Sequence, residues 1–163
     1  MSTIKAWAAQ TAGGKLEPFE YDPGPLGDEE VEIAVEYCGI CHSDLSLLNN
    51  DWGMTRYPFV PGHEAAGRVG AMGPQAKGVS IGQRVGVGWN SHSCMHCKQC
   101  LMGHQNLCES LQPTLIGRHG AFANKVRAHW VWTMPLPEGL DSRDCGPLLC
   151  GGITVFAPLR ELN

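Results

Sequence analysis

The segment Glu30-Val31-Glu32-Ile33-Ala34-Val35-Glu36-Tyr37 alternates between acidic and apolar side chains. Its odd positions carry four apolar side chains, Val31, Ile33, Val35 and Tyr37. A repeat of two residues is typical of a strand that buries one face and exposes the other. The segment therefore predicts a half-buried strand, with the aliphatic side chains toward a core and the glutamates toward water.

Shorter runs of the same kind lie on both sides of this strand and are bounded by Gly, Pro or Asn. They predict further strands at Ile4–Ala8, Leu16–Tyr21, Arg68–Ala71, Arg84–Trp89, Phe122–Arg127 and Val131–Thr133. Ser43–Leu48 is expected to form a short helix, and Gly152–Leu162 a last helix that Pro158 bends. The chain has 21 glycines and 11 prolines among 163 residues, which indicates many turns. These features predict a mainly β fold, an irregular β-barrel with a few short helices.

Composition excludes several classes of protein. The 12 basic and 16 acidic residues give a formal net charge of -4, so no positive field attracts nucleic acid or an anionic membrane. No window approaches roughly twenty apolar residues, and the N-terminus does not resemble a secretory leader. We therefore expect a cytoplasmic protein. No G-x-G-x-x-G follows a predicted strand, so we expect no dinucleotide-binding domain in this sequence.

The densest group of cysteines has the spacing C-x2-C-x2-C-x7-C and consists of Cys94, Cys97, Cys100 and Cys108. Four thiolates at this spacing can surround one tetrahedral ion and leave no open position, which favours a structural zinc site in a loop at about 90–110. An iron–sulfur cluster and four unrelated thiols are the alternatives. Ferredoxin loops place their next cysteine after about three residues, before a proline, whereas Cys108 comes later and precedes Glu109.

A second group of residues with candidate metal-binding side chains is dispersed over the chain. It comprises Cys38-Gly39-Ile40-Cys41-His42-Ser43-Asp44, then Gly62-His63-Glu64, then Leu149-Cys150-Gly151-Gly152. No local spacing rule connects these segments. Taken alone, Cys38 and Cys41 could form a redox dithiol, and His63 would be an ordinary core or loop histidine.

Four stretches together carry a family resemblance that covers essentially the whole chain. They are Cys38–Asp44, Tyr57-Pro58-x-x-Pro61-Gly62-His63-Glu64-x-x-Gly67, the four-cysteine loop, and Gly146–Thr154. With them the sequence resembles the N-terminal, GroES-like catalytic domain of the zinc-containing medium-chain alcohol dehydrogenases, in the cinnamyl-alcohol-dehydrogenase-like group.

The resemblance assigns roles to the dispersed residues. It implies that Cys41, His63 and Cys150 hold a catalytic zinc, with Glu64 as an occasional ligand and two Zn²⁺ per chain in all. Asp44 matches the carboxylate that holds the non-coordinating N–H of the histidine ligand. Ser43 matches a hydroxyl that passes the alcohol proton outward, although it could equally cap a helix. His42 falls where relatives carry a polar residue near the cofactor pyrophosphate, although a solvent-facing histidine explains it as well.

The resemblance also implies a function and a domain plan. Trp52 and Met54 match the wall of the substrate pocket, although a tryptophan can also simply belong to a core. We expect residues 1–157 to form the catalytic domain and 158–163 to start the connection to a Rossmann domain that lies outside this sequence. The implied reaction interconverts primary alcohols and aldehydes with NADP or NAD. The alternative is a stand-alone zinc-binding module without redox activity, and a homo-oligomer is left open.

Overall fold

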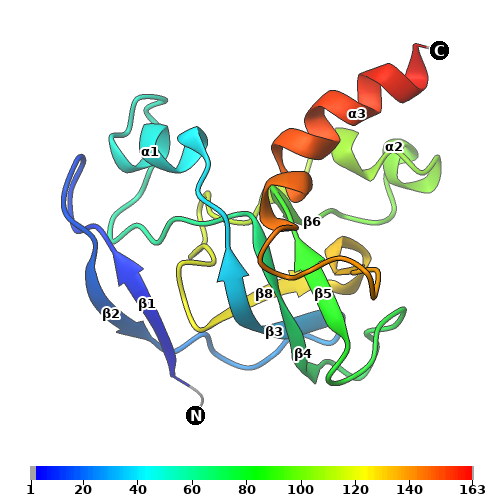
Figure 1. The fold of residues 1–163 in the computed structure, drawn as a ribbon, viewed down its shortest axis with the longest axis horizontal. Coiled ribbons are helices and arrows are strands. Elements are labelled where there is room, and N and C mark those ends of the chain that lie inside the picture. The colour runs from blue at the N-terminus through cyan, green and yellow to red at the C-terminus, as the bar shows by residue number, and fades with distance from the viewer. Residues whose placement is uncertain (1–2, 163) are drawn as a thin grey trace.

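The computed structural model describes residues 3–162, and antiparallel sheets dominate it (Figure 1). A five-stranded sheet has the order β8-β3-β4-β5-β9, and a hairpin of β1 (Ile4–Ala8) and β2 (Glu17–Tyr21) lies beside it. The five strands are β3 (Glu30–Cys38), β4 (Ala65–Met72), β5 (Arg84–Val87), β8 (Lys125–His129) and β9 (Met134–Pro135). The mainly β prediction is confirmed, although the described strands form an open sheet and do not close into a barrel.

Strand β3 covers the predicted alternating segment and lies at the centre of the fold. Its Val31 and Ile33 are 0% and 1% exposed and belong to a core that also takes residues from β4, β5 and β8. The alternation fails at two positions. Glu32 is buried, because Lys125 and Arg127 on β8 bind its carboxylate at 2.6 and 2.9 Å. Tyr37 is exposed, beyond a register shift between β3 and β4 at Val35/Tyr37.

The predicted strand Ile4–Ala8 is found with the ends expected, and most of the others are found with shifted ends. The predicted strand 122–127 begins only at Lys125, because residues before it pair with β1 instead. Phe122 accepts a hydrogen bond from the Trp7 N–H, and the Asn124 N–H donates to Lys5. The predicted strand Val131–Thr133 is wrong, since the single 3-10 turn η2 (Trp130–Trp132) lies there. The Val131 N–H donates to Nδ1 of His129, a local bond that competes with strand pairing.

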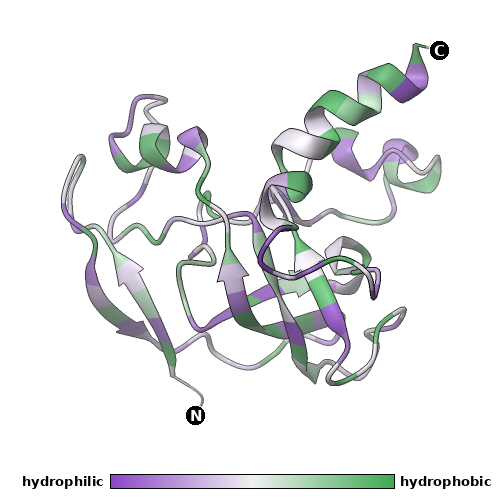
Figure 2. Cartoon of the chain, viewed as in Figure 1, coloured by the Kyte–Doolittle hydropathy of each residue, from purple (hydrophilic) through white to green (hydrophobic). Residues whose placement is uncertain are grey.

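The helices are few and short. The predicted helices correspond to α1 (His42–Leu48) and α3 (Gly151–Glu161), and Pro158 lies inside α3. A small lobe contains β6 (Asn90–His92), α2 (Lys98–Leu101), η1 (Gln105–Leu107) and β7 (Gln112–Pro113). The 3-10 turn η3 (Gly146–Leu149) leads directly into α3. Helix α3 projects from the sheet although it is mainly apolar, and it contains no buried residue (Figure 2).

The structure also bears on the membrane prediction. Among residues 3–162, no helix has the length and apolar character needed to cross a bilayer.

Candidate metal centres

The start of α1 is built around the buried carboxylate of Asp44. Cys41 is the residue that caps the helix, and its backbone N–H donates to Asp44 Oδ2 at 2.9 Å. Asp44 Oδ1 accepts two further bonds, from the Gly62 N–H at 2.8 Å and from Nδ1 of His63 at 3.1 Å. Asp44 therefore joins the Cys38–Asp44 and Gly62–Glu64 segments. Ser43 lies inside the helix and is not its cap.

The dispersed cysteines and His63 converge on one point. The Sγ atoms of Cys41 and Cys150 are 3.9 Å apart, and His63 Nε2 lies 3.3 Å from Cys150 Sγ. Since Asp44 accepts the proton of Nδ1, the lone pair of Nε2 is directed toward these sulfurs. One ligand atom from each of Cys41, His63, Glu64 and Cys150 lies within 4.8 Å of the others. We call this set the dispersed site.

In the dispersed site, the pKa of each group depends on burial and on its hydrogen bonds and charge interactions with the neighbouring groups. Burial raises the pKa of Cys41, but hydrogen bonds from Ser43, then from His63 and Cys150, outweigh it and lower the pKa. Burial, together with the charge on Cys41, raises the pKa of Cys150 to about 12. Burial opposes a charge on His63, but the bond to Asp44 raises its pKa. A divalent cation would balance the charge of two neighbouring thiolates and so allow both to ionise.

Glu64 provides an independent test of whether a cation fits. The side chain is 4% exposed, burial raises its pKa, and its Oε2 is buried without a hydrogen-bond partner among the described residues. A buried, unpaired carboxylate oxygen is costly. The orphaned oxygen and the two-sulfur, one-imidazole donor set both fit a zinc ion.

The four-cysteine loop forms a second compact donor set. Ligand atoms of Cys94, Cys97, Cys100 and Cys108 lie within 4.8 Å of one another. The Cys97 N–H donates to Cys94 Sγ at 3.3 Å, and the Cys94 N–H donates to Cys108 Sγ at 3.4 Å. Backbone N–H groups directed at sulfur stabilise thiolates, as tetrahedral zinc sites require.

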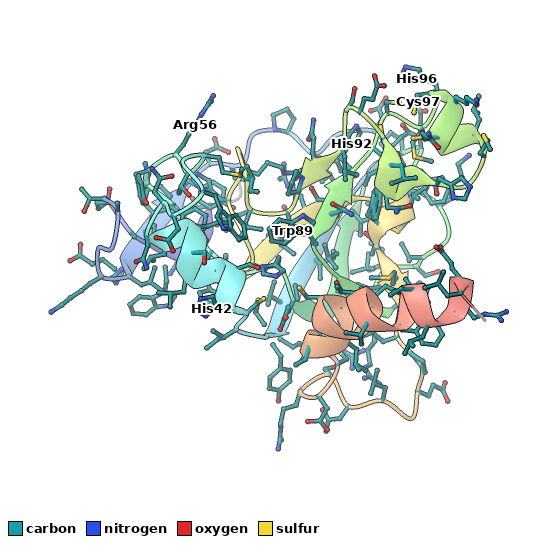
Figure 3. The ribbon with its side chains drawn as sticks, turned by 90° about the horizontal axis from the view of Figure 1, so that it is seen from above. His42, Arg56, Trp89, His92, His96 and Cys97 are labelled. Atoms are coloured by element: carbon teal, nitrogen blue, oxygen red, sulfur yellow. The ribbon has the colours of Figure 1, made fainter. Side chains whose placement is uncertain are left out.

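Bonds from the backbone at His96 and Cys97 lower the pKa of Cys94 to about 6, while burial raises the pKa of Cys100 to about 11. His96 Nδ1 lies 2.6 Å from the Cys94 carbonyl oxygen. In Figure 3, His96 and Cys97 lie at the end of the molecule away from His42 and Trp89. The two donor sets are therefore separate centres.

Aromatic side chains lie beside the dispersed site. The ring of Trp89 stands edge-on to His63, with centroids 4.9 Å apart, and Trp52 stands edge-on to Trp89 at 6.3 Å. Trp52 and Met54 are 46% and 48% exposed, so neither is a core residue. Figure 3 places Trp89 between α1 and α3. Sequence reasoning missed Trp89, which only ended a predicted strand and carried no motif.

His42 begins α1 and is exposed, and Figure 3 places it on the helix surface. A cavity of about 540 Å³ opens elsewhere, between the β1–β2 hairpin and the end of β3, and is lined by Trp7, Tyr37 and Phe122. None of the metal donors lines it. The candidate site is therefore identified by its donor atoms and not by cavity size.

An antiparallel sheet with two such donor sets matches a known class of catalytic domains. The family described as alcohol dehydrogenase GroES-like domain matches residues 27–138, and this chain belongs to that family. Among its relatives, the aldehyde reductase AdhA of Synechocystis sp. is 56% identical over 98% of this chain and 48% of that protein. A probable cinnamyl alcohol dehydrogenase of Oryza sativa subsp. japonica is 38% identical over 98% of this chain and 46% of that protein. The family expected from the sequence is thus confirmed.

Solved structures agree in fold. A cinnamyl alcohol dehydrogenase from Sorghum bicolor superposes with a TM-score of 0.93 at 36% identity, over 99% of this chain and 48% of that one. A cinnamyl alcohol dehydrogenase from Helicobacter pylori complexed with NADP(H) gives 0.92 at 28% identity, over 98% and 48%. A cobalt- and zinc-bound alcohol dehydrogenase from Pyrobaculum aerophilum gives 0.84 at 28%, over 98% and 49%. The chain spans about half the length of these proteins.

Proposed function

We propose that this chain is the zinc-binding catalytic domain of an alcohol dehydrogenase that interconverts primary alcohols and aldehydes with NADP or NAD. The observation that carries the proposal is the convergence of Cys41, His63 and Cys150 from three distant segments, with Asp44 behind the histidine. The names of the relatives and the metal- and NADP(H)-bound neighbours support it. We assign the dispersed site to a catalytic zinc and the four-cysteine site to a structural one.

A zinc ion at the dispersed site would act as a Lewis acid toward the substrate oxygen, so that alcohol deprotonation and aldehyde polarisation occur near neutral pH. The protein residues prepare the site for this role. Cys41 and Cys150 would supply two negative charges, and His63 a neutral imidazole. Asp44 holds the His63 ring in one tautomer and orientation, which favours ligation through Nε2.

Ser43 and His42 are suited to carry the alcohol proton to water. Hydrogen bonds from Ser43 lower the pKa of Cys41, which places Ser43 beside that sulfur. His42 precedes Ser43 in α1 and is exposed. A hydroxyl that accepts the substrate proton and an exposed imidazole that releases it would form a short relay. His42 would also lie near the cofactor.

The wall of the substrate pocket would be apolar. Trp89 lies next to His63 and Trp52 next to Trp89, so they provide large apolar surfaces near the donor atoms, and we assign the exposed Met54 to the same wall. Such surfaces favour an alcohol or aldehyde with an apolar, even aromatic, body. The nicotinamide cofactor would be held by a Rossmann domain in the other half of a protein of the relatives' length, joined through residues 158–163.

Metal analysis tests the proposal directly. The chain should contain two zinc ions, one for each donor set. His63→Ala should remove about one of them and leave the four-cysteine site filled, while Cys97→Ser should remove the other and unfold its loop. His104→Ala provides the matched control, because that exposed histidine belongs to neither set. Zinc content unchanged by His63→Ala, or iron in the four-cysteine loop, would overturn the assignment.

Activity is tested on the chain joined to a nicotinamide-binding domain in one polypeptide. Alcohol-dependent NADP or NAD reduction should be lost in Cys41→Ser and retained in His104→Ala. A protein that keeps both zinc ions but shows no such reaction would favour the zinc-binding module without redox activity.

A further inference from the structure

Gly39 lies in the connection between β3 and α1, directly against the carboxylate of Glu64. A Cβ atom on Gly39 would lie 2.0 Å from Glu64 Oε2 and 3.1 Å from both Cβ and Cδ of the same side chain. Carbon and oxygen atoms that are not bonded do not approach to 2.0 Å. The Glu64 carboxylate thus occupies the space that any side chain at position 39 would need.

The backbones on both sides of this contact also lie close together. The Gly39 N–H donates to the Glu64 carbonyl oxygen at 3.0 Å, which holds the two backbones together. A Cβ on Gly146 would lie 3.1 Å from both the Gly39 nitrogen and the Glu64 carbonyl oxygen, so η3 packs against the same junction.

The carboxylate itself is held by packing and not by hydrogen bonds at its inner oxygen. Glu64 Oε2 is buried and unpartnered within residues 3–162, while a ligand atom of Glu64 lies within 4.8 Å of those of Cys41, His63 and Cys150. No hydrogen bond to the described residues therefore fixes Oε2 in this place.

We propose that Gly39 is a positioning residue: because it has no side chain, the Glu64 carboxylate can remain buried beside the three other donors of the dispersed site. The inference rests on the proposed function for the identity of the ion. The steric contact between position 39 and Glu64 does not depend on the proposed function. A methyl group at position 39 would force the carboxylate out of this place.

The first test compares the unfolding of the metal-free chain and three variants, Gly39→Ala, Glu64→Ala and the double variant. Gly39→Ala should lower the unfolding midpoint by several degrees. In the double variant, Glu64→Ala should recover most of this loss, because it removes the oxygen nearest to the new methyl group, while the 3.1 Å contact between the two Cβ atoms remains. Gly139→Ala is the matched control, since a Cβ there meets nothing within 4 Å.

The four unfolding measurements on the unaltered chain, the two single variants and the double variant form an unfolding cycle. This cycle tests the proposal even if a variant does not fold. Failure of Gly39→Ala to fold, with folding restored in the double variant, would support the proposal. Equal losses with and without the Glu64 carboxylate, or failure of both variants to fold, would overturn it, because the methyl group would then act through the backbone.

The second test uses Co²⁺ as the probe, with the four-cysteine site filled first by Zn²⁺. Gly39→Ala should shift the visible absorption of the bound Co²⁺ and weaken its binding by about tenfold or more. In the Glu64→Ala background, Gly39→Ala should change neither, and Gly139→Ala should leave both as in the unaltered chain. A Gly39→Ala variant with unaltered Co²⁺ spectrum and affinity would overturn the proposal. An unaltered chain that binds no second ion would instead refute the proposed function, and the unfolding cycle would still decide the role of Gly39.

Discussion

At the scale of single residues, Asp44 connects the most functional groups. Its carboxylate accepts bonds from the Cys41 N–H, the Gly62 N–H and the His63 ring. Asp44→Asn would direct an amide N–H at one or more of these donors and loosen the orientation of the imidazole. We expect about a 10- to 100-fold loss of zinc affinity at the dispersed site.

A competitive chelator titration measures this loss, with zinc in the four-cysteine site as the internal reference. Asp51→Asn is the control, because Asp51 is exposed and belongs to neither donor set. Equal zinc affinities of the two variants would show that Asp44 does not support the metal ligand.

Glu32 is the residue that should make stability depend on pH. Burial acts to raise its pKa, but hydrogen bonds from Lys125 and Arg127 outweigh burial and hold the pKa below the ordinary 4.5. The stabilisation is therefore fully present above pH 4.5 and is lost as the pH falls through the lowered pKa of the folded state. Glu32→Gln should cost about 3 kcal/mol near pH 7, since it leaves two cations unpaired.

Unfolding at a series of pH values checks this prediction. The difference in free energy of unfolding between the unaltered chain and Glu32→Gln should shrink steadily below about pH 4.5. The control is Glu20→Gln, whose partner Lys5 is 4.0 Å away and largely exposed, and which should cost almost nothing. A difference that is independent of pH would contradict the role given to the Glu32 carboxylate.

The two donor sets differ in how far the sequence predicts them. Cys94, Cys97, Cys100 and Cys108 lie within one loop, so their spacing alone indicates a metal site. Cys41, His63 and Cys150 are brought together only by the tertiary fold, and only the family resemblance linked them. Trp89 has neither local spacing nor a quoted motif, and its place beside His63 depends on the path between β5 and β6.

At the scale of the elements, close backbone contact between β5 and η3 positions Cys150. A Cβ atom on Gly88 would lie 2.4 Å from the carbonyl oxygen of Leu149, the residue before Cys150. A backbone oxygen cannot rotate away as a side chain can, so Gly88→Ala must displace η3. We expect a loss of about 1–3 kcal/mol in unfolding free energy from overpacking, together with weaker metal binding at the dispersed site.

Calorimetry and metal analysis of the same samples check both effects. Zinc should be lost from the dispersed site first and retained by the four-cysteine loop, whose donor set does not include Cys150. The open position Gly139 again supplies the control as Gly139→Ala. A Gly88→Ala variant with full metal content and an unchanged unfolding midpoint would show that η3 accommodates the added methyl group.

The predicted elements fail where tertiary or local polar contacts outweigh strand propensity. The alternating residues of β3 predict a strand because burial and periodicity agree there. Val131 has the β-branched character of a strand residue, yet its N–H donates to the His129 ring and a 3-10 turn results. Glu32 follows the alternation of an exposed position, but two cations on β8 allow it to be buried.

At the scale of the whole molecule, the sheet topology differs from that of a dinucleotide-binding domain. Each strand pair in residues 3–162 is antiparallel, whereas a dinucleotide is held by parallel strands with crossover helices and a glycine-rich turn. The described part of the chain thus brings candidate metal donors together, and its strands do not form that parallel arrangement.

A polypeptide of these 163 residues should therefore bind zinc at both donor sets but transfer hydride far more slowly than an enzyme. Hydride transfer requires the nicotinamide ring within about 3–3.5 Å of the substrate carbon, and such positioning supplies about 7–11 kcal/mol of the barrier. Zinc content by mass spectrometry and NADPH absorbance with a series of primary alcohols measure the two properties on one sample. The same residues joined to a nicotinamide-binding domain serve as the positive control. Rapid NADP reduction by the 163-residue polypeptide, abolished by Cys41→Ser, would show that its antiparallel fold binds the cofactor itself, in a way that none of its described strands and helices suggests.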